Sequence, residues 1–161
     1  MIGAVCRGGR GGRGLESGVV DATVTPLTDV QVTWIREQLA AAAQFTADYG
    51  ADRTLTGLAA VDHAWASWLD RQAVDPEDPD TVINAVAVYL GQSIVETLPG
   101  FEWVLSLDDD GSDLAVLGLP GALDLLVFPA DLVAKGYQSR TAPLLEPAHA
   151  SIVDQVGRLR P

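Results

Sequence analysis

The acidic stretch Asp108-Asp109-Asp110-Gly111, followed closely by Asp113, is the densest group of metal-ligating side chains in the sequence. Carboxylate oxygens grouped at a turn can bind Ca²⁺ or Mg²⁺. If Gly111 takes the sixth position of an EF-hand loop, however, Ser106 takes the first and Leu117 the twelfth, where a bidentate acid is needed. We therefore predict a hairpin turn that carries solvated acids, Asp108 and Asp110 among them, with a weak adventitious cation site as the alternative.

The two histidines, His63 and His149, lie outside any metal-binding or catalytic pattern. His63 falls on an expected helix, but it has no second histidine at helical spacing, so the H-E-x-x-H motif of zinc enzymes is absent. His149 stands near the start of an expected C-terminal helix. We expect both to be surface or hydrogen-bonded structural side chains.

Nucleophiles and cofactor motifs are equally sparse. No serine lies in a G-x-S-x-G elbow, and the single cysteine, Cys6, has no neighbouring base. Gly9, Gly11 and Gly14 match G-x-G-x-x-G, but the residues after Gly14 do not start the helix that a dinucleotide-binding loop requires. No P-loop sequence occurs. We therefore predict no catalytic residue, no metal and no cofactor.

Tryptophan side chains are the other candidates, because indoles anchor both protein cores and protein interfaces. Trp65 and Trp68 share one face of an expected helix, and Trp103 falls on the inner face of an expected strand. We interpret all three as core or core-edge residues. Any two of the four tryptophans, of which Trp34 is the fourth, would instead mark an interface if both proved exposed.

A polar cleft between sheet and helices is the alternative kind of site. Its candidate residues are the carboxylates Glu96, Glu102 and Asp131 and the only lysine, Lys135. A small-molecule-binding protein or an enzyme would use such convergent polar groups with perturbed pKa values.

Hydrophobic periodicity and turn residues predict the elements that position these side chains. A capping box at Thr28 and Gln31 precedes a helix over 29–49, and a second helix follows over about 58–71. An almost wholly apolar helix begins at Asp80, which we expect to cap it, and ends before Pro99-Gly100. A helix of that kind belongs in the centre of a fold.

The second half of the chain changes to the alternation typical of strands. The expected strands cover 101–107, 113–119 and 123–128, and short helices follow over 130–136 and from Pro147 onward. We predict an α+β fold in which N-terminal helices and a central buried helix pack on a small antiparallel sheet of about three strands, with C-terminal helices. Residues 27–161 form a single domain in this prediction, and residues 1–26 form a flexible Gly/Arg-rich tail.

The excess of acidic residues indicates which classes of macromolecule the chain could bind. The sequence holds 22 acidic and 10 basic residues, a formal net charge of −12. Such a field repels phosphate backbones, so nucleic-acid binding by the folded domain is disfavoured, although the Arg-Gly run of the tail could tether RNA. The same field favours a basic protein partner.

No uninterrupted apolar run reaches the length of about 18 residues that a membrane helix needs, so no membrane association is expected. The first residues also lack the apolar region and cleavage site of a signal peptide. Together with the single cysteine, this predicts a cytoplasmic protein. The abundance of Ala, Val and Arg is typical of bacterial genomes rich in G and C.

Several motifs are similar to a bacterial family known as domain of unknown function 3806. They are the run Asn84 to Gly91, Phe101-Glu102-Trp103-Val104, the acidic turn at Asp108 to Gly111, and Val127-Phe128-Pro129 leading into Leu132-Val133-Ala134-Lys135. The resemblance covers about residues 29–135. It implies a compact α+β bacterial domain and carries over no catalytic residue.

Two functional hypotheses follow. The first is a non-catalytic, acidic protein-interaction module, conceivably one that masks a basic partner as bacterial immunity or antitoxin proteins do. The second is a small-molecule-binding protein or enzyme that uses carboxylates and Lys135 in a cleft between sheet and helices. The residues in which either activity would be sought are Trp65, Trp68, Glu102, Trp103, Asp108, Asp110 and Lys135.

Overall fold

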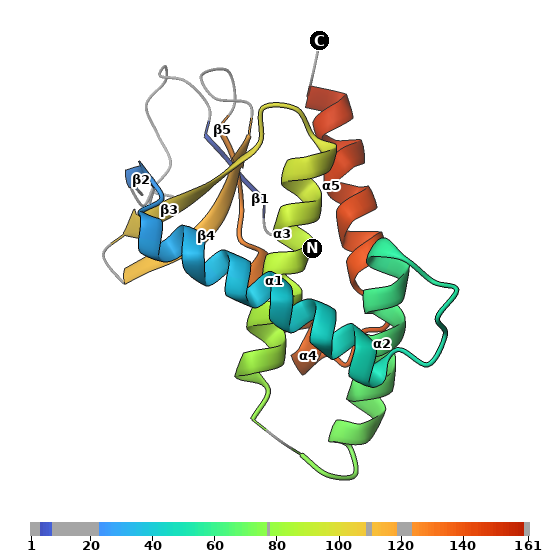
Figure 1. Cartoon of the computed structure of the whole chain (residues 1–161). Coiled ribbons are helices and arrows are strands. Elements are labelled where there is room, and N and C mark those ends of the chain that lie inside the picture. Colours follow the sequence, from blue (N-terminus) through green and yellow to red (C-terminus); the bar gives the residue numbers. More distant parts are fainter. Residues whose placement is uncertain (1–3, 8–22, 77, 109–110, 119–123, 160–161) are drawn as a thin grey trace.

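The computed structural model of the chain describes residues 4–7, 23–76, 78–108, 111–118 and 124–159. In this part of the chain, five helices and one five-stranded antiparallel sheet form an α+β fold, as predicted. The sheet lies at one end of the molecule, and the helices extend from it (Figure 1).

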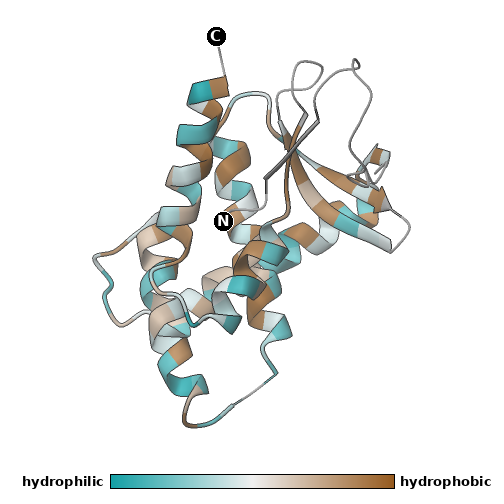
Figure 2. Cartoon of the chain, turned by 180° about the vertical axis from the view of Figure 1, so that it is seen from behind, coloured by the Kyte–Doolittle hydropathy of each residue, from teal (hydrophilic) through white to brown (hydrophobic). Residues whose placement is uncertain are grey.

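The helices are α1 (Asp29–Tyr49), α2 (Gly57–Gln72), α3 (Asp80–Thr97), α4 (Pro129–Gln138) and α5 (Leu145–Leu159). The strands are β1 (Ala4–Arg7), β2 (Thr23–Pro26), β3 (Glu102–Asp108), β4 (Gly111–Gly118) and β5 (Asp124–Val127). The order across the sheet is β1-β5-β4-β3-β2. Hydrophobic residues along β3 and β4 give way to hydrophilic residues at their hairpin end (Figure 2).

The sheet has two strands more than the roughly three that the sequence pattern predicted. Both come from the segment before residue 27 that was assigned to a tail: β1 pairs with β5, and β2 pairs with β3. Each is four residues long, too short for its own alternation to identify it, and each depends on its neighbour for pairing. Residues 8–22, which include most of the Gly/Arg run, lie outside the described residues.

β2 ends in a proline because it is an edge strand. Asp108 pairs with Gly111 at the end of the β3–β4 hairpin, and such closing pairs are hydrogen-bonded. Alternate β3 residues such as Leu105 therefore direct their backbone groups toward β2, where Leu105 pairs with Thr25. The backbone of Pro26, one residue along, consequently faces away from the sheet. Proline has no N–H to leave unpaired there, and it blunts the edge against further strands.

α3 forms the centre of the fold. Its buried residues lie on several sides of the helix, from Ala85 through Leu90 to Ile94. α1, α4 and α5 all contact it. This arrangement confirms the prediction that the apolar stretch after Asp80 is a central helix, because only burial on all sides suits such a surface.

Of the two helix caps predicted from sequence, the one at α1 is confirmed and the one at α3 is not. At α1 the capping box is present: the Thr28 N–H donates to Gln31 Oε1 at 2.8 Å, and the Gln31 N–H donates to Thr28 Oγ1 at 3.5 Å. At α3 the N-cap residue is Pro79, and Asp78 Oδ1 accepts from the Asp80 N–H at 3.1 Å. The capping carboxylate thus comes from Asp78 instead of Asp80.

Replacing Thr28 with alanine should lower the free energy of unfolding by about 1 kcal/mol, because the first turn of α1 loses its side-chain acceptor. Thr33→Ala on the same helix is the matched control, since Thr33 is exposed and lies beyond the cap. Urea denaturation of both variants tests this. Equal effects of the two substitutions would contradict a capping role for Thr28.

Candidate functional site

Trp65 and Trp68 are core residues, with 0% and 1% of their surface exposed. Their ring centroids lie 5.2 Å apart, and Trp68 also contacts the rings of Phe45 and Tyr137. The Trp65 indole N–H donates to the Thr141 carbonyl at 2.9 Å. The core interpretation is therefore the one the structure supports, and neither residue can contribute to a protein-interaction surface of the folded chain.

Asp62, one turn before Trp65 and Ala66, is a buried carboxylate that the sequence analysis did not single out. Its Oδ1 accepts from the backbone N–H groups of Leu144 and Leu145 at 2.8 and 2.7 Å, and its Oδ2 accepts from that of Glu146 at 2.8 Å. These are the orphan donors at the start of α5. Asp62 is thus an N-cap supplied by another helix, a structural role that satisfies both of its oxygens.

Of the polar residues expected in a sheet-helix cleft, only Glu102 lines one of the three hollows described below, while Asp131 and Lys135 lie one turn apart on α4. Glu102 is exposed and lines a groove along β2 and β3. Lys135 is exposed in the last turn of α4 and lines none of the three hollows described below. Glu96 accepts a hydrogen bond from Gln92 Nε2 at 2.9 Å. Burial raises the pKa of the nearby Tyr89 phenol, and the charge of Glu96 adds to this shift.

Metal-ligating groups are dispersed in the same way. The hairpin predicted at the acidic turn is present, since β3 pairs with β4 up to Asp108 and Gly111, but the side chains of Asp108 and Asp110 lie outside the described residues. Within the described ranges, no three His, Cys, Asp or Glu side chains come together as metal ligands would. His149 Nε2 lies 3.1 Å from Thr97 Oγ1 and 3.3 Å from the Ser93 carbonyl oxygen, and so links α5 to α3.

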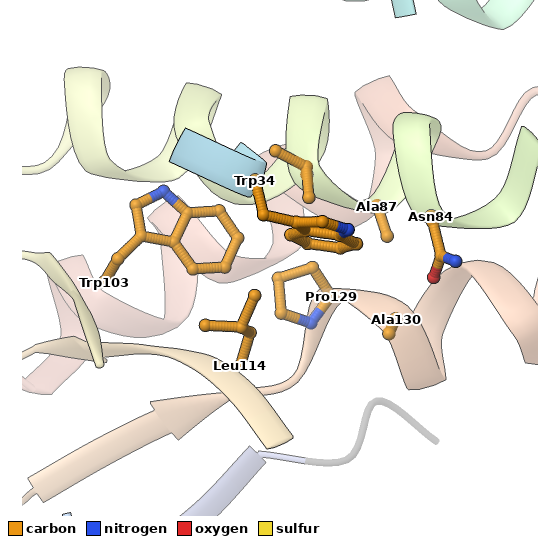
Figure 3. Close-up of a pocket in the computed structure, with 8 residues that line it drawn as sticks. Trp34, Asn84, Ala87, Trp103, Leu114, Pro129 and Ala130 are labelled. Carbon is orange, nitrogen blue, oxygen red and sulfur yellow. The ribbon is translucent and has the colours of Figure 1, made fainter. Parts of the chain in front are cut away.

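Trp103 occupies a different position from the two core indoles, because it is only half-buried. Its N–H donates to Gln92 Oε1 at 3.1 Å, and its ring packs against Gly91 of α3, where no larger residue would fit. Together with Trp34 of α1 it lines a small hollow between α1, α3, α4 and the sheet (Figure 3). The space is about 30 Å³, enough for a water molecule.

The other residues around this hollow are almost all apolar. They are Asn84, Ala87, Val88, Leu114, Pro129 and Ala130. In Figure 3 the Trp34 ring lies over Pro129 with Trp103 beside it, while Asn84 lies at the far end. The indole of Trp34 is therefore held in place by packing on its inner side.

Two larger, open hollows adjoin these tryptophans. One, of about 370 Å³, lies on the first turns of α1 and is lined by Asp29, Val30, Thr33, Trp34 and Glu37. The other, of about 400 Å³, is a groove lined by Val24, Thr25, Pro26, Leu27, Glu102, Trp103, Val104 and Leu117. Trp34 lines both the small hollow and the hollow on α1. Trp103 lines both the small hollow and the groove beside β2.

We call the lining of these two open hollows the Trp34–Trp103 surface. Its charged residues are Asp29, Glu37 and Glu102, all acidic. It also carries large exposed hydrophobic side chains, with Val30 78% and Val24 37% exposed. An apolar surface of this kind rimmed by charge is typical of binding sites.

Of the residues proposed from sequence, Trp103 and Glu102 belong to this surface. Trp34 was considered with the other tryptophans but was not placed in the site, and Val30 was missed. The sequence did contain a signal for Val30 and Trp34. They are four residues apart on α1 and therefore adjacent on the helix, and both fall outside its main apolar stripe. Large hydrophobic residues on the polar side of an amphipathic helix indicate a second contact surface.

Among the helices that the structure describes, none is long and apolar enough to cross a membrane. No curated protein sequence matches the chain. A crystal structure of a protein from Bacteroides thetaiotaomicron VPI-5482, at 1.50 Å resolution, has a similar fold, with a TM-score of 0.61 and 12% sequence identity. The match covers 89% of this chain and 52% of that one, so this chain spans about half the length of the neighbour. At this identity the likeness concerns the fold alone.

The sequence profile of one protein family matches residues 63–143, which run from α2 to the loop before α5. This span includes the central helix, the β3–β4 hairpin and α4, the segments on which the resemblance was based. It covers half of the chain. The chain therefore belongs to the family described as domain of unknown function DUF3806.

Proposed function

We propose that the chain is a non-catalytic, acidic protein-interaction module that binds a basic segment of a partner protein at the Trp34–Trp103 surface. The observation that carries this proposal is the composition of the surface, in which exposed apolar side chains are flanked by carboxylates and no basic residue lines either open hollow.

Electrostatics supports a basic partner at both long and short range. The net charge of −12 attracts a basic protein from a distance and accelerates its encounter. At close range, Asp29 and Glu37 are exposed and form no ion pair with any other residue in the described part of the chain. Their charge is therefore available to an incoming cation.

The apolar part of the surface supplies the area that stable docking needs. Val30 is 78% exposed and lines the same hollow as the half-buried indole of Trp34. The half-buried indole of Trp103 lines the groove beside β2. Tryptophans at the centre of an interface, surrounded by charged residues, are the usual arrangement of binding hot spots. Because Pro26 blunts the edge of β2, the partner segment docks through its side chains and not by adding a strand.

Replacing Val30 with lysine should weaken partner binding by about tenfold or more, because it buries a charge in the apolar part of the interface and repels a basic partner. Val74→Lys is the matched control: it adds the same charge at a valine that is 87% exposed and lies after α2, away from the surface. The measurement is affinity purification of both tagged variants from the native host, followed by calorimetry with the purified partner.

The proposal requires a stoichiometric, basic partner that is captured by the wild type and by Val74→Lys and lost with Val30→Lys. Three outcomes would overturn it: an acidic partner, equal capture by both variants, or a retained small molecule with no protein partner.

A further inference from the structure

We propose that the partner is anchored by an arginine or lysine side chain seated over the Trp34 indole between Asp29 and Glu37. This inference rests on the proposed function and specifies the chemistry of its central contact.

The spacing on α1 places the necessary groups around one hollow. Asp29, Thr33 and Glu37 follow at intervals of four residues and form a row along the helix, and Val30 and Trp34 form the adjacent row. All five line the open hollow on α1. The two carboxylates are about 12 Å apart along the helix axis, so a cation above the indole lies within about one Debye length of both.

The indole itself is positioned as a fixed platform. Trp34 lines the small hollow together with Pro129, Trp103 and Leu114 (Figure 3), and it also lines the open hollow on α1. A ring held in this way loses little conformational freedom when a ligand stacks on it. Tryptophan is also the side chain whose ring attracts cations most strongly.

The charges around the ring select a cation over other ligands. An anion would be repelled by Asp29 and Glu37, and no basic residue lines the hollow to offset this repulsion. A neutral side chain would gain contact area but no electrostatic attraction. Arginine combines a planar group that stacks on the indole with five N–H donors for the carboxylates, and lysine supplies the charge alone.

Blocked amino acids test this anchor without the partner. The chain has four tryptophans, so ¹⁵N-labelled protein should give four indole N–H signals, which Trp→Phe substitutions would assign. We expect N-acetyl-arginine amide to shift the Trp34 signal saturably, with a dissociation constant of about 1–10 mM that rises with salt. The signals of Trp65 and Trp68 should not move, because both rings are buried.

Two controls distinguish binding that depends on the charge of the probe from binding that depends only on its shape. N-acetyl-citrulline amide, the neutral counterpart of the arginine probe, should bind at least about threefold more weakly. Glu37→Gln should weaken arginine binding about two- to fivefold, whereas Asp70→Asn, an exposed acid on α2, should leave it unchanged. Equal binding of citrulline and arginine, or no saturable shift of the Trp34 signal, would overturn the anchor.

The failure of this inference is distinguishable from the failure of the proposed function. If Val30→Lys abolishes partner capture while arginine leaves the Trp34 signal in place, the interaction surface stands and the cationic anchor is wrong. If arginine shifts the Trp34 signal with the expected dependence on Glu37 and no protein partner is captured, the anchor chemistry stands and the protein-binding function falls.

Discussion

Replacing Asp62 with alanine should lower the free energy of unfolding by about 3–5 kcal/mol. The substitution removes the carboxylate that accepts from the backbone N–H groups of Leu144, Leu145 and Glu146, and these donors have no other acceptor within α5. It also removes the three hydrogen bonds that join α2 to the start of α5, so that apolar packing remains to link the two there. Urea denaturation measures the loss, and amide hydrogen exchange should show faster opening at residues 144–146 than elsewhere in α5.

Two variants on the same helix test this explanation. Asp62→Asn keeps the shape and one acceptor oxygen, so it should cost less than alanine but more than a surface substitution. Asp70→Ala removes an exposed carboxylate of α2 and should change stability by less than about 0.5 kcal/mol. An Asp62→Ala protein as stable as Asp70→Ala would show that the three hydrogen bonds contribute nothing net.

Replacing Gly91 with alanine should lower the free energy of unfolding by about 2 kcal/mol, although alanine is the better helix former. A Cβ atom at this position would lie 2.2 Å from Trp103 Cη2 and 3.0 Å from Pro129 Cγ. The indole would have to move, and it would then lose its hydrogen bond to Gln92. Thermal or urea denaturation measures the effect.

Gly157→Ala is the matched control, because no atom lies within 4 Å of the added Cβ in α5 and the substitution should stabilise the protein by about 0.5–1 kcal/mol. A second test is the double variant Gly91→Ala, Trp103→Phe, in which the smaller ring relieves the clash. Its loss should be smaller than the sum of the two single losses. Additive losses would contradict direct contact between Gly91 and Trp103.

The Gly91 contact also matters for the candidate site. It allows the Trp103 ring to approach α3 closely enough to line the small hollow beside Trp34. A displaced Trp103 would therefore alter the Trp34–Trp103 surface as well as stability. We expect Gly91→Ala to weaken partner binding even at temperatures where the protein remains folded.

Local features of the sequence were sufficient to predict several elements. The bounds of α1 coincide with the prediction because a capping box at Thr28 and a terminal Gly50 lie within one turn of the ends. The hairpin at Asp108 to Gly111 and the central position of α3 were likewise predictable from turn residues and from apolar residues on every side. Each of these signals acts between residues a few positions apart.

Other features depend on residues that are distant in sequence, and here prediction failed. The four-residue strands β1 and β2 exist because β5 and β3 offer free edges to pair with. The cap supplied by Asp62 joins residues 82 to 84 positions apart, a distance at which no spacing rule applies. Neither could be recognised before the elements were placed together.

At the candidate site, too, some features followed from the sequence and others depended on the tertiary structure. Composition by itself established the acidic charge, from which we predicted a basic partner and disfavoured nucleic-acid binding. It could not establish which tryptophans are accessible, since Trp65, Trp68 and Trp103 all occupy apolar positions of their elements. The tertiary structure decided this, because the burial of a side chain depends on which neighbouring element covers it. Trp65 and Trp68 are fully buried in the core, whereas Trp34 and Trp103 are half-buried and line the hollow between α1, α3, α4 and the sheet.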